Sequence, residues 1–450
     1  MQGNILLSIK NQLKSPLFIL FCIAFVIRLV FGIIMYTMNG TSNFNDDWDY
    51  ISYANNILSQ GIWVPDISLL RSNSHLGGPG FPLVLAGLFY IFGENYLIVV
   101  LFNALVSAIV VVLIFFLGKE IFNEKIGIYV AGWATFYVLF FKYIPNVLKT
   151  VLLLLLFLLA VYLFIKETKR SRISWQSFFP IIIYTFLIHV DERFFTFFPV
   201  FIISFVFLDN ISYKNGIKKA TLFFLIVCLL MVPWLIRNYI VYGDRVVILT
   251  ERTARFTDKI FGYDPMLSDY GKVNKKIAEF KWDESLIDDI LAGKKVSGLK
   301  GKRYKGLQEG LRQGYIPHEF NTFEKWKSDF INHWSPLRLK AGYVSTGFRF
   351  RGAWSLKHNF TVGTSYGLLL PFFLLGSIFI IKHKNKYGIF LLVIILVNTL
   401  IHVLLMGIER YRLPIDPFII IIAFYGLYQI YLYFKARTLI APHKISEISN

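Results

Sequence analysis

The chain has 450 residues, of which 56% are hydrophobic and only 17% charged, and its mean hydropathy is +0.56. Soluble globular chains carry about 25% charged residues, so this composition excludes a soluble enzyme, a disordered chain and a nucleic-acid-binding module, and it indicates a polytopic membrane protein. The formal net charge of +19 comes from Lys and Arg residues in loops between apolar runs. That pattern is typical of membrane topology and of contact with anionic lipid head groups.

Residues 16–38 form the first long apolar run, after a polar segment with Lys10 and Lys14. A signal peptide has an apolar core of about 7–15 residues followed by a cleavage site of small residues. Because this run is longer and ends in YTMNGTSN, we expect an uncleaved first span with an inside N-terminus. Arg28 lies within the run. A charge at membrane depth is costly, so Arg28 should face the protein interior, with a carboxylate of the outer loops as its candidate partner.

Nine further apolar runs predict spans, because a helix needs about 20 residues to cross a bilayer. They are 96–118, 126–141, 146–165, 176–190, 193–208, 218–240, 363–381, 387–407 and 413–434. The run 80–94 is shorter and begins among prolines, so we expect a re-entrant or interfacial helix there. Counting it as a span would place the basic loop 166–172 outside, against the positive-inside rule. The expected fold class is an all-α polytopic membrane protein with about ten transmembrane helices, one short re-entrant or interfacial helix and outer loops.

Two long polar segments divide the chain into three parts. Residues 1–240 form an N-terminal transmembrane half that includes a first outer, catalytic loop at 39–79. Residues 241–362 carry mixed charge and several tryptophans, which predicts a small folded outer domain or lid. Residues 363–450 form the C-terminal transmembrane helices and a cytoplasmic tail. The sequence contains no visible internal repeat, although repeats are common in transporters.

The first candidate site, NFNDDWDYISYANNILSQG, follows the first span directly. Asn45 can cap a helix that begins with Asp46 and Asp47, where acidic side chains favour the positive helix end. A carboxylate at the water–lipid boundary can also act as a general base toward a hydroxyl group, or as an oxygen ligand of a hard cation. Asp49 lies about one turn from Asp46, and Tyr50 begins an apolar stripe. A structural helix start and a catalytic acid pair both remain open on these residues alone.

Three further segments carry candidate ligands at the ends of spans. In SHLGGPGFPLVLAGLFYIFG, glycines and prolines predict a sharp turn into the short helix, and His75 is either a base or ligand or an ordinary loop residue. In MVPWLIRNYIVYG, Arg237 either snorkels to the surface or binds phosphate through its planar guanidinium. In GIERYRLPIDPF, Arg410 and Arg412 flank Tyr411, and two arginines at a membrane surface suit a lipid-borne phosphate, with snorkelling as the alternative.

Charged residues also lie within or beside the middle spans, at Lys149 and in the sequence Asp191–Glu192–Arg193. Charges at membrane depth either mark function or pair with one another.

In this order, and on one side of the membrane, these segments resemble the GT-C superfamily of glycosyltransferases that use lipid-linked sugars. The closest likeness is to the bacterial family related to protein O-mannosyltransferases and the lipid A aminoarabinose transferase. The resemblance covers about residues 16–434 except 241–362. Its motifs are an acid pair followed by a tyrosine, a Pro-Gly-aromatic-Pro turn, a PW..RN segment and an RY..P..P segment. They comprise Asp46, Asp47, Tyr50, Pro79, Gly80, Phe81, Pro82, Pro233, Trp234, Arg237, Asn238, Arg410, Tyr411, Pro414 and Pro417.

Three positions depart from the pattern of that family. Family members often carry Glu-Thr where this chain has Lys149-Thr150, and an arginine-proline pair where Arg193 is followed by Phe194. The acid pair is Asp-Asp, where Asp-Glu is common.

The resemblance implies a glycosyltransferase that takes a sugar from a polyprenyl-phosphate-linked donor, on the outer face of the cytoplasmic (inner) membrane, and transfers it with inversion to a lipid, glycan or protein acceptor. Asp46 would be the general base, and Asp47 would assist it or bind a divalent metal such as Mg or Mn. The leaving phosphate needs cations, with Arg410 and Arg412 as first choices, then Arg237, then Lys149. The expected substrate-binding residues are Asp49, Tyr50, His75, Lys149, Arg193, Arg237, Arg410, Tyr411 and Arg412.

Three other functions fit a membrane protein of this kind. A transporter or lipid flippase would also contain buried charges, and it predicts charges near the membrane midplane and two related halves. An oligosaccharide polymerase or ligase would also use lipid-linked glycans. An inactive relative could serve as a structural subunit of an envelope assembly, in line with the departure at Lys149. The acid pair after the first span favours the transferase.

Overall fold

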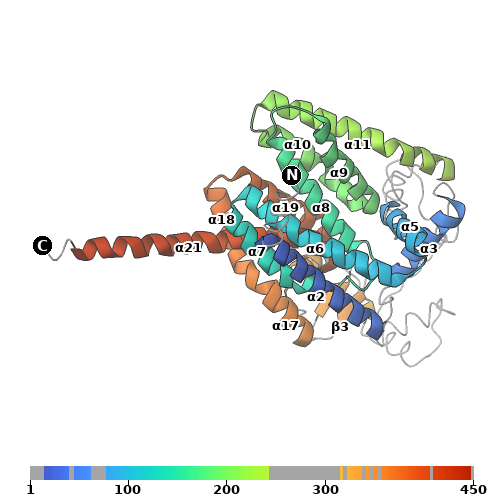
Figure 1. The fold of residues 1–450 in the computed structure, drawn as a ribbon, viewed down its shortest axis with the longest axis horizontal. Coiled ribbons are helices and arrows are strands. Elements are labelled where there is room, and N and C mark those ends of the chain that lie inside the picture. The colour runs from blue at the N-terminus through green and yellow to red at the C-terminus, as the bar shows by residue number, and fades with distance from the viewer. Residues whose placement is uncertain are drawn as a thin grey trace, which may run out of the picture. The chain divides into compact units, whose positions relative to one another are not determined.

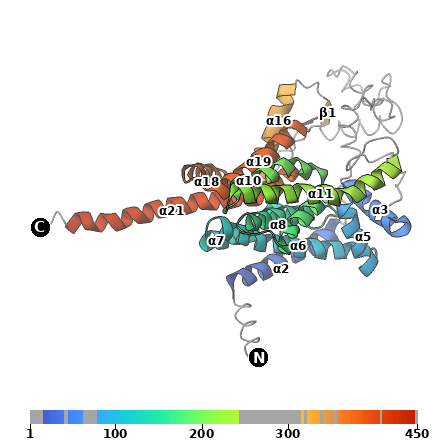
Figure 2. The ribbon, with the colours of Figure 1, turned by 90° about the horizontal axis from the view of Figure 1, so that it is seen from above.

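The computed structural model describes residues 15–39, 45–61, 78–242, 315–317, 322–336, 341–344, 348–351, 356–405 and 409–446. Figures 1 and 2 show them as a ribbon in two views. They fall into two compact units, a larger one within residues 1–254, 368–395 and 413–450, and a smaller one within residues 255–367 and 396–412. Most of the predicted outer domain 241–362 lies outside the described residues, so the predicted three-part division stays a prediction.

The larger unit is helical, and side chains near the helix ends explain several of its boundaries. Asn95 accepts a hydrogen bond from the backbone of Leu97 at the start of α6, and Asn123 does the same for Ile126 at the start of α7. The elements are α2 (Pro16–Asn39), α3 (Asn45–Gln60), α5 (Gly80–Phe92), α6 (Tyr96–Ile121), α7 (Glu124–Phe136), η1 (Val138–Phe140), α8 (Thr150–Thr168), η2 (Trp175–Ser177), α9 (Phe178–Val190), η3 (Glu192–Phe197), α10 (Phe198–Leu208), α11 (Tyr213–Tyr242), α18 (Leu370–Lys382), the first half of α19 (Lys386–Leu405), η6 (Leu413–Ile415) and α21 (Asp416–Ser446).

The smaller unit combines short strands with helices. Strands β1 (Tyr315–Pro317), β2 (Ala341–Val344) and β3 (Phe348–Arg351) form an antiparallel sheet in the order β1-β3-β2. Its helices are α16 (Thr322–Trp334), α17 (Leu356–Ser365), the second half of α19 and α20 (Glu409–Arg412), and η5 (Gly367–Leu369) lies where the two units join in sequence.

The prediction of an all-α polytopic membrane protein is confirmed in class, because the described residues are mostly helical, but helix length supports fewer than ten spans. Seven described helical segments are long and apolar enough to cross a membrane: 16–38, 96–121, 150–168, 213–240, 362–382, 386–404 and 410–436. The other three predicted runs form α7, α9 and α10, which have only 13, 13 and 11 residues. Each is short because an irregular or 3-10 segment adjoins it. Helix α5, with 13 residues, is also too short to cross, as expected for the run 80–94.

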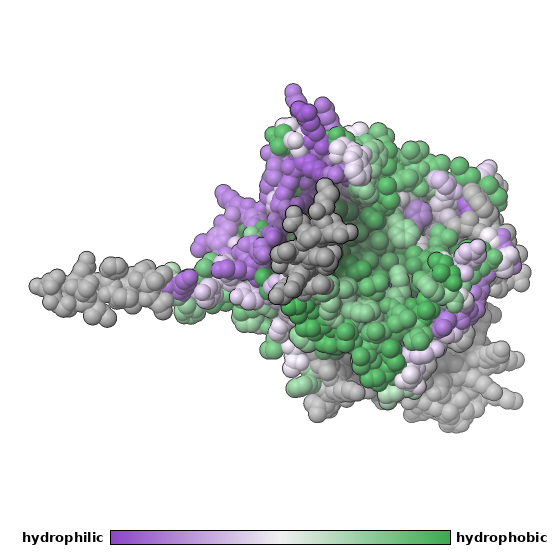
Figure 3. Space-filling view, in the orientation of Figure 1, coloured by the Kyte–Doolittle hydropathy of each residue, from purple (hydrophilic) through white to green (hydrophobic). Residues whose placement is uncertain are grey.

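The exterior of the protein suits a lipid environment. Large apolar side chains such as Val26, Ile203, Leu229 and Leu396 are exposed, and the face in Figure 3 is dominated by hydrophobic residues, with hydrophilic residues gathered beside them. Helix α8 is the most buried of the seven candidate spans. Its Phe157 packs against Phe194, Phe197 and Phe418 of the surrounding elements.

The backbone between α7 and α8 is not α-helical, although it is buried. After α7 ends at Phe136, residues 137–149 form one 3-10 turn and a series of further turns, and Ile144, Asn146 and Leu148 are buried. Asn103 of α6 donates hydrogen bonds to the carbonyl groups of Ile144 (3.1 Å) and Asn146 (3.0 Å). Since water is absent at membrane depth, backbone of this kind is tolerated only where the protein satisfies its polar groups.

Arg28, near the middle of α2, contributes to the same backbone region. It is fully buried, as predicted, but its partners are not a carboxylate of the outer loops. Its guanidinium donates to the carbonyl groups of Ala134 (2.9 Å) and Thr135 (3.0 Å), and its Nε donates to Ser107 (2.8 Å). These carbonyls lie in the last turn of α7, where the regular helical hydrogen bonds end and the carbonyl of Ala134 receives only a long bond (3.4 Å) from the backbone N–H of Tyr137. Arg28 therefore stabilises the end of α7 inside the membrane.

The Pro-Gly-aromatic-Pro turn packs directly on the end of α9. A Cβ atom at Gly78 would lie 2.3 Å from the carbonyl oxygen of His189, and one at Gly80 would lie 2.7 Å from the backbone nitrogen of Val190. Both contacts are with backbone, which cannot move aside easily. Glycine is required here because α5 begins against the last residues of α9.

Substituting two glycines of α5 tests this packing. Gly80→Ala should lower stability by about 1–3 kcal/mol, because the added methyl group overpacks the contact with α9. Gly87→Ala, in the same helix, meets nothing within 4 Å and should raise stability by about 0.5–1 kcal/mol through helix propensity. The apparent melting temperatures of the detergent-purified variants measure both effects. Equal shifts for the two variants would contradict the close approach of α5 and α9.

Candidate functional site

Asp47 lies in the first turn of α3, and its side chain points into the protein. It is fully buried, and its Oδ2 accepts a long hydrogen bond (3.4 Å) from the backbone N–H of Val147 in the irregular segment. Tyr50, one turn later, is buried against Phe81 of α5, with ring centres 5.0 Å apart. The side chains of Asp46 and Asp49, and His75 as a whole, lie outside the described residues. The acid pair is thus represented in the structure by Asp47.

Lys149 is the last residue of the irregular segment and the N-cap of α8. Its Nζ lies 3.0 Å from Oδ2 of Asp191, and the two side chains are 7% and 1% exposed. Asp191 also accepts from Arg193, at 2.9 Å from Nε to Oδ1 and 3.1 Å from the backbone N–H. This is an ion triad in which the buried Asp191 holds the buried Lys149 and the partly exposed Arg193.

The charge state of this triad is set by its cations. Burial alone would raise the pKa of Asp191, but Arg193 and Lys149 hold it well below its ordinary value. Asp191 is therefore ionised at physiological pH. The sequence predicted that the charge of Asp191 is either functional or paired, and its partners in the structure are Lys149 and Arg193.

A second group of polar and aromatic residues adjoins the end of α9. The guanidinium of Arg237, on α11, lies 4.8 Å from the centre of the Trp234 ring and donates to Asn238 at 3.0 Å. The His189 ring is 6.3 Å from that of Trp234. His189 is the residue whose carbonyl contacts Gly78, and it stands two positions before Asp191. The PW..RN segment, the glycine turn and the ion triad therefore meet around the last turn of α9.

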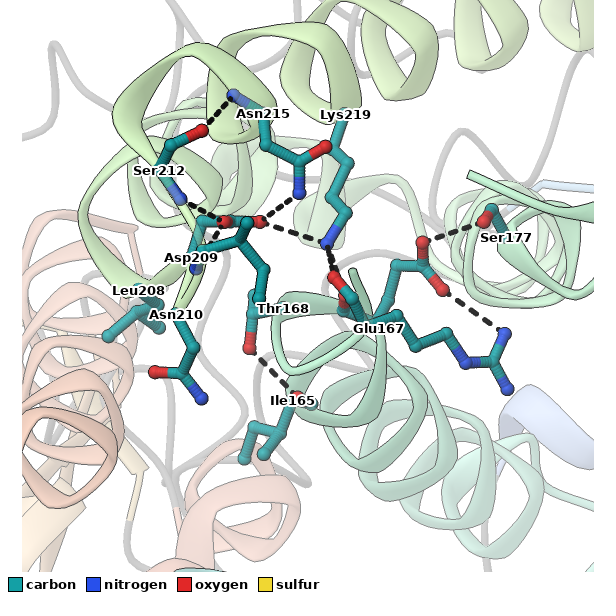
Figure 4. Close-up of polar contacts among 12 residues, drawn as sticks. Ile165, Glu167, Thr168, Ser177, Leu208, Asp209, Asn210, Ser212, Asn215 and Lys219 are labelled. Atoms are coloured by element: carbon teal, nitrogen blue, oxygen red, sulfur yellow. Dashed lines mark hydrogen bonds and ion pairs between the residues drawn. The ribbon is translucent and has the colours of Figure 1, made fainter. Parts of the chain in front are cut away.

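The opposite end of α8 carries a different polar network, drawn in Figure 4. Lys219 donates to the carbonyl groups of Glu167 and Arg170, both at 2.7 Å, and to Asp209 at 2.9 Å. Glu167 in turn accepts from Ser177 (2.6 Å). At 1.5 Å per residue, the two ends of α8 are about 28 Å apart, close to the thickness of about 30 Å of a bilayer's hydrocarbon core. The Lys149 triad and this network therefore lie about one bilayer thickness apart.

Arg410, Tyr411 and Arg412 belong to the smaller unit. Arg412 is fully buried, with its guanidinium 3.5 Å from the centre of the Tyr366 ring and its Nη1 donating to the carbonyl of His333 at 2.9 Å. The Tyr411 ring lies 5.2 Å from that of His402. The predicted hollow that the aspartates share with these arginines stays a prediction, because the two groups belong to separate units.

The smaller unit also contains polar residues that the sequence analysis did not single out. The rings of His333 and His402 stack at 5.4 Å, and Asn398 lies between α16 and α20, 3.4 Å from His333 and from the carbonyl of Tyr411. The available signal was the presence of Asn398 and His402 inside the otherwise apolar run 387–407.

The predicted divalent metal has no counterpart in the side chains that the structure describes. Within them, His, Cys, Asp and Glu do not gather in threes. Because the side chain of Asp46 lies outside that set, a Mg or Mn site on Asp46 and Asp47 stays a prediction.

Comparisons with known proteins agree with this architecture. Residues 77–236 match the family model described as dolichyl-phosphate-mannose-protein mannosyltransferase. The fold of the chain is similar to that of the apo oligosaccharyltransferase of Archaeoglobus fulgidus. The TM-score is 0.55 and the identity 14%, over 93% of this chain and 52% of the other. The chain is also similar to the complex of the same organism's oligosaccharyltransferase AglB with an inhibitory peptide and a dolichol-phosphate. That match has a TM-score of 0.54 and 13% identity, and it covers 93% of this chain and 51% of the other. No curated protein matches the chain in sequence.

These matches confirm the resemblance to GT-C membrane glycosyltransferases. The matched family segment runs from the glycine turn to Ile236, next to Arg237, and contains Lys149 and Asp191. The chain spans about half the length of the solved structures that it matches.

Removing either member of the Lys149–Asp191 pair should destabilise the protein unequally. Asp191→Asn leaves the buried Lys149 and the partly exposed Arg193 without their carboxylate and should cost about 3–5 kcal/mol. Lys149→Met leaves Asp191 paired with Arg193 and should cost less. Because the folded pKa of Asp191 is depressed, its stabilisation is complete above its unfolded pKa and is lost only as the pH falls toward the folded value. Melting temperatures at pH 5–8 should therefore show a constant loss for Asp191→Asn. A larger loss for Lys149→Met would contradict the shared role of Asp191.

Proposed function

We propose that the chain is a membrane glycosyltransferase that transfers a sugar from a polyprenyl-phosphate-linked donor to an acceptor on the outer face of the cytoplasmic membrane. One observation carries the proposal. The buried Asp47 contacts the irregular segment at Val147, and two residues later that segment places the buried Lys149 in an ion triad. A carboxylate for the acceptor and a cation for a phosphate thus lie at one end of the same buried segment.

The reaction proposed is a single displacement. The oxygen of an acceptor hydroxyl attacks the anomeric carbon, its proton passes to a carboxylate of the acid pair, and the bond from that carbon to the phosphate oxygen breaks. Asp46 would be the base and Asp47 would assist it, as the resemblance implies. Inversion at the anomeric carbon follows from one displacement, and polyprenyl phosphate leaves.

The leaving phosphate gains charge, which preorganised cations stabilise. Lys149, Arg193 and Arg237 lie in the same unit as Asp47, and we therefore place them before Arg410 and Arg412, reversing the order that the sequence favoured. Arg412 already donates to the carbonyl of His333 and stacks on Tyr366. Arg410 and Arg412 stay candidates for contacts to the acceptor or to the donor's lipid phosphate.

The donor class is supported by two printed names. The matched family is named for dolichyl-phosphate-mannose, and one similar oligosaccharyltransferase structure contains a dolichol-phosphate. The side of the membrane is supported by the two ends of α8, because Lys166, Lys169 and Arg170 lie at the end away from Lys149. Basic loops favour the cytoplasm, which supports an outer position for Lys149 and Asp47.

The structure removes one argument for a transporter. Arg28, the charge set deepest in a span, is bound to the carbonyls that end α7 and to Ser107. It stabilises the fold, so it is not needed as a charge that accompanies a transported substrate.

Replacing the acid pair tests the proposal. Asp47→Asn and Asp46→Asn should each slow transfer by about 100-fold or more, the scale of general acid–base catalysis, while the melting temperature changes little. The assay mixes purified protein in liposomes with an envelope extract from a strain that lacks this protein, which supplies both the lipid-linked sugars and the acceptors. Mass spectrometry follows the conversion of the lipid-linked sugars to polyprenyl phosphate. Glu124→Gln, at an exposed carboxylate at the start of α7 that pairs with Lys119, is the matched control and should keep full activity. Unchanged turnover in both aspartate variants would contradict a role for the acid pair.

A further inference from the structure

The helix ends around Glu167, drawn in Figure 4, are joined to one another by lysine side chains. Lys219 of α11 donates to the carbonyl of Glu167 and to the carboxylate of Asp209. Lys386, at the start of α19, donates to the carbonyl of Leu208 at 3.2 Å. The ends of α8, α10, α11 and α19 therefore form one connected surface.

Positive charge on this surface is in large excess. The segments 118–126, 166–177, 208–219 and 382–388, together called the basic end, contain twelve Lys and Arg residues and only four Asp and Glu residues. Each of the four carboxylates already binds a cation, in the pairs Glu124–Lys119, Glu120–Lys166, Glu120–Lys169, Glu167–Arg170 and Asp209–Lys219. Six exposed cations of these described segments belong to none of the pairs: Lys125, Arg172, Lys214, Lys218, Lys382 and Lys384. An anionic partner would therefore meet charge that the basic end does not neutralise itself.

Arg172 is the exposed cation whose backbone is best fixed. Two residues before it, Arg170 binds the carboxylate of Glu167 at 3.2 Å. After it, the hydroxyl of Ser177 donates to Glu167 at 2.6 Å and accepts from the backbone N–H of Ser174 at 3.0 Å. Both sides of the α8–α9 turn are thus attached to the buried Glu167. A cation on a preorganised turn loses less conformational entropy on binding than one on a mobile loop.

Exposed aromatic side chains follow Arg172 along the chain. Trp175 is 69% exposed and Phe179 is 45% exposed, and their ring centres lie 5.4 Å apart. Trp175 stands just before the apolar helix α9, and Phe179 lies in its first turn. Tryptophan favours the head-group region of a bilayer, because its ring is apolar and its N–H is polar. The order of a cation, an indole and a phenyl ring matches the phosphate, glycerol and acyl chain of a phospholipid, whereas a water-soluble anion or an acidic protein does not require the aromatic pair.

We propose that the α8–α9 turn is a binding site for an anionic phospholipid, with Arg172 on the lipid phosphate and with Trp175 and Phe179 against the glycerol and the upper part of an acyl chain. The guanidinium group suits a phosphate because its planar N–H groups can donate to two oxygens at once. Lys218 adds positive charge from α11, which contacts the same turn. The positive excess favours a net-anionic lipid over a zwitterionic one. The site does not depend on the proposed glycosyl transfer, so either can fail without the other.

Thermal stabilisation of the full-length protein in a non-ionic detergent measures the lipid preference. Dioleoyl phosphatidylglycerol should raise the melting temperature by several degrees more than dioleoyl phosphatidylcholine, because a ligand of the folded state stabilises that state. Arg172→Gln should lose at least half of this difference, while its melting temperature without added lipid should match that of the wild type. Lys125→Gln, at another exposed lysine of the basic end on α7, is the matched control and should keep the full difference.

Fluorescence quenching places the lipid by a second readout. Lipids brominated in the acyl chain quench nearby tryptophans, and the wild type minus Trp175→Phe isolates the emission of Trp175. In liposomes of otherwise neutral lipid, brominated phosphatidylglycerol should quench this emission at least twice as strongly as brominated phosphatidylcholine. With Arg172→Gln added to both proteins, the two lipids should quench it equally.

Four results would overturn the inference. Equal effects of the two lipids on the wild type, or equal losses in Arg172→Gln and Lys125→Gln, would show that the basic end acts only through diffuse charge. Stabilisation by glycerol phosphate as large as that by phosphatidylglycerol would indicate an anion site without a lipid. An equal response to polyglutamate would indicate an acidic protein as the partner.

Discussion

The fold depends on a stretch of non-helical backbone that is buried between α7 and α8. Residues 137–149 are largely buried and interrupt what would otherwise be two spans in a row. Such a segment is stable only because side chains of neighbouring helices bind backbone carbonyls. Asn103 of α6 binds carbonyls inside the segment, and Arg28 of α2 binds carbonyls just before it, at the end of α7. Each hydrogen bond to a charged donor of this kind contributes about 1.5–3 kcal/mol. Ending α7 early brings Lys149 to the start of α8 and Val147 to Asp47.

Charge at the two ends of α8 serves two different purposes. At one end, Lys219 binds backbone carbonyls and Asp209, which joins α8 to the loop before α11 and fixes that boundary. At the other end, Lys149 and Arg193 share Asp191, and two positions before Lys149 the N–H of Val147 contacts the buried Asp47. A carboxylate that holds two cations keeps them in place. The contacts at the first end are structural, and the second end combines carboxylates and cations, as a candidate active site would.

The sequence predicted the membrane class, the short helix after the glycine turn and the residues that cluster around α9, because hydropathy, prolines and buried charges are local signals. It did not predict that α7, α9 and α10 are short, since apolar residues continue through the turns that end them. It assigned Arg28 a carboxylate partner, because the need of backbone carbonyls for a donor appears only once α7 is known to end at Phe136. The pairing of Lys149 with Asp191 joins residues 42 positions apart, and no periodicity encodes such a contact.

The central claim is that Lys149 meets the phosphate of a polyprenyl-linked donor at the end of the buried segment where Asp47 serves the acceptor. A structure of the protein in lipid nanodiscs with bound polyprenyl phosphate tests it most directly. The account predicts a phosphate oxygen within about 4 Å of Lys149 Nζ, the range of an ion pair, on the same side of the membrane as Asp47. A phosphate bound at the Lys219 end of α8, or one that leaves the contact between Lys149 and Asp191 untouched and lies away from both, would contradict it.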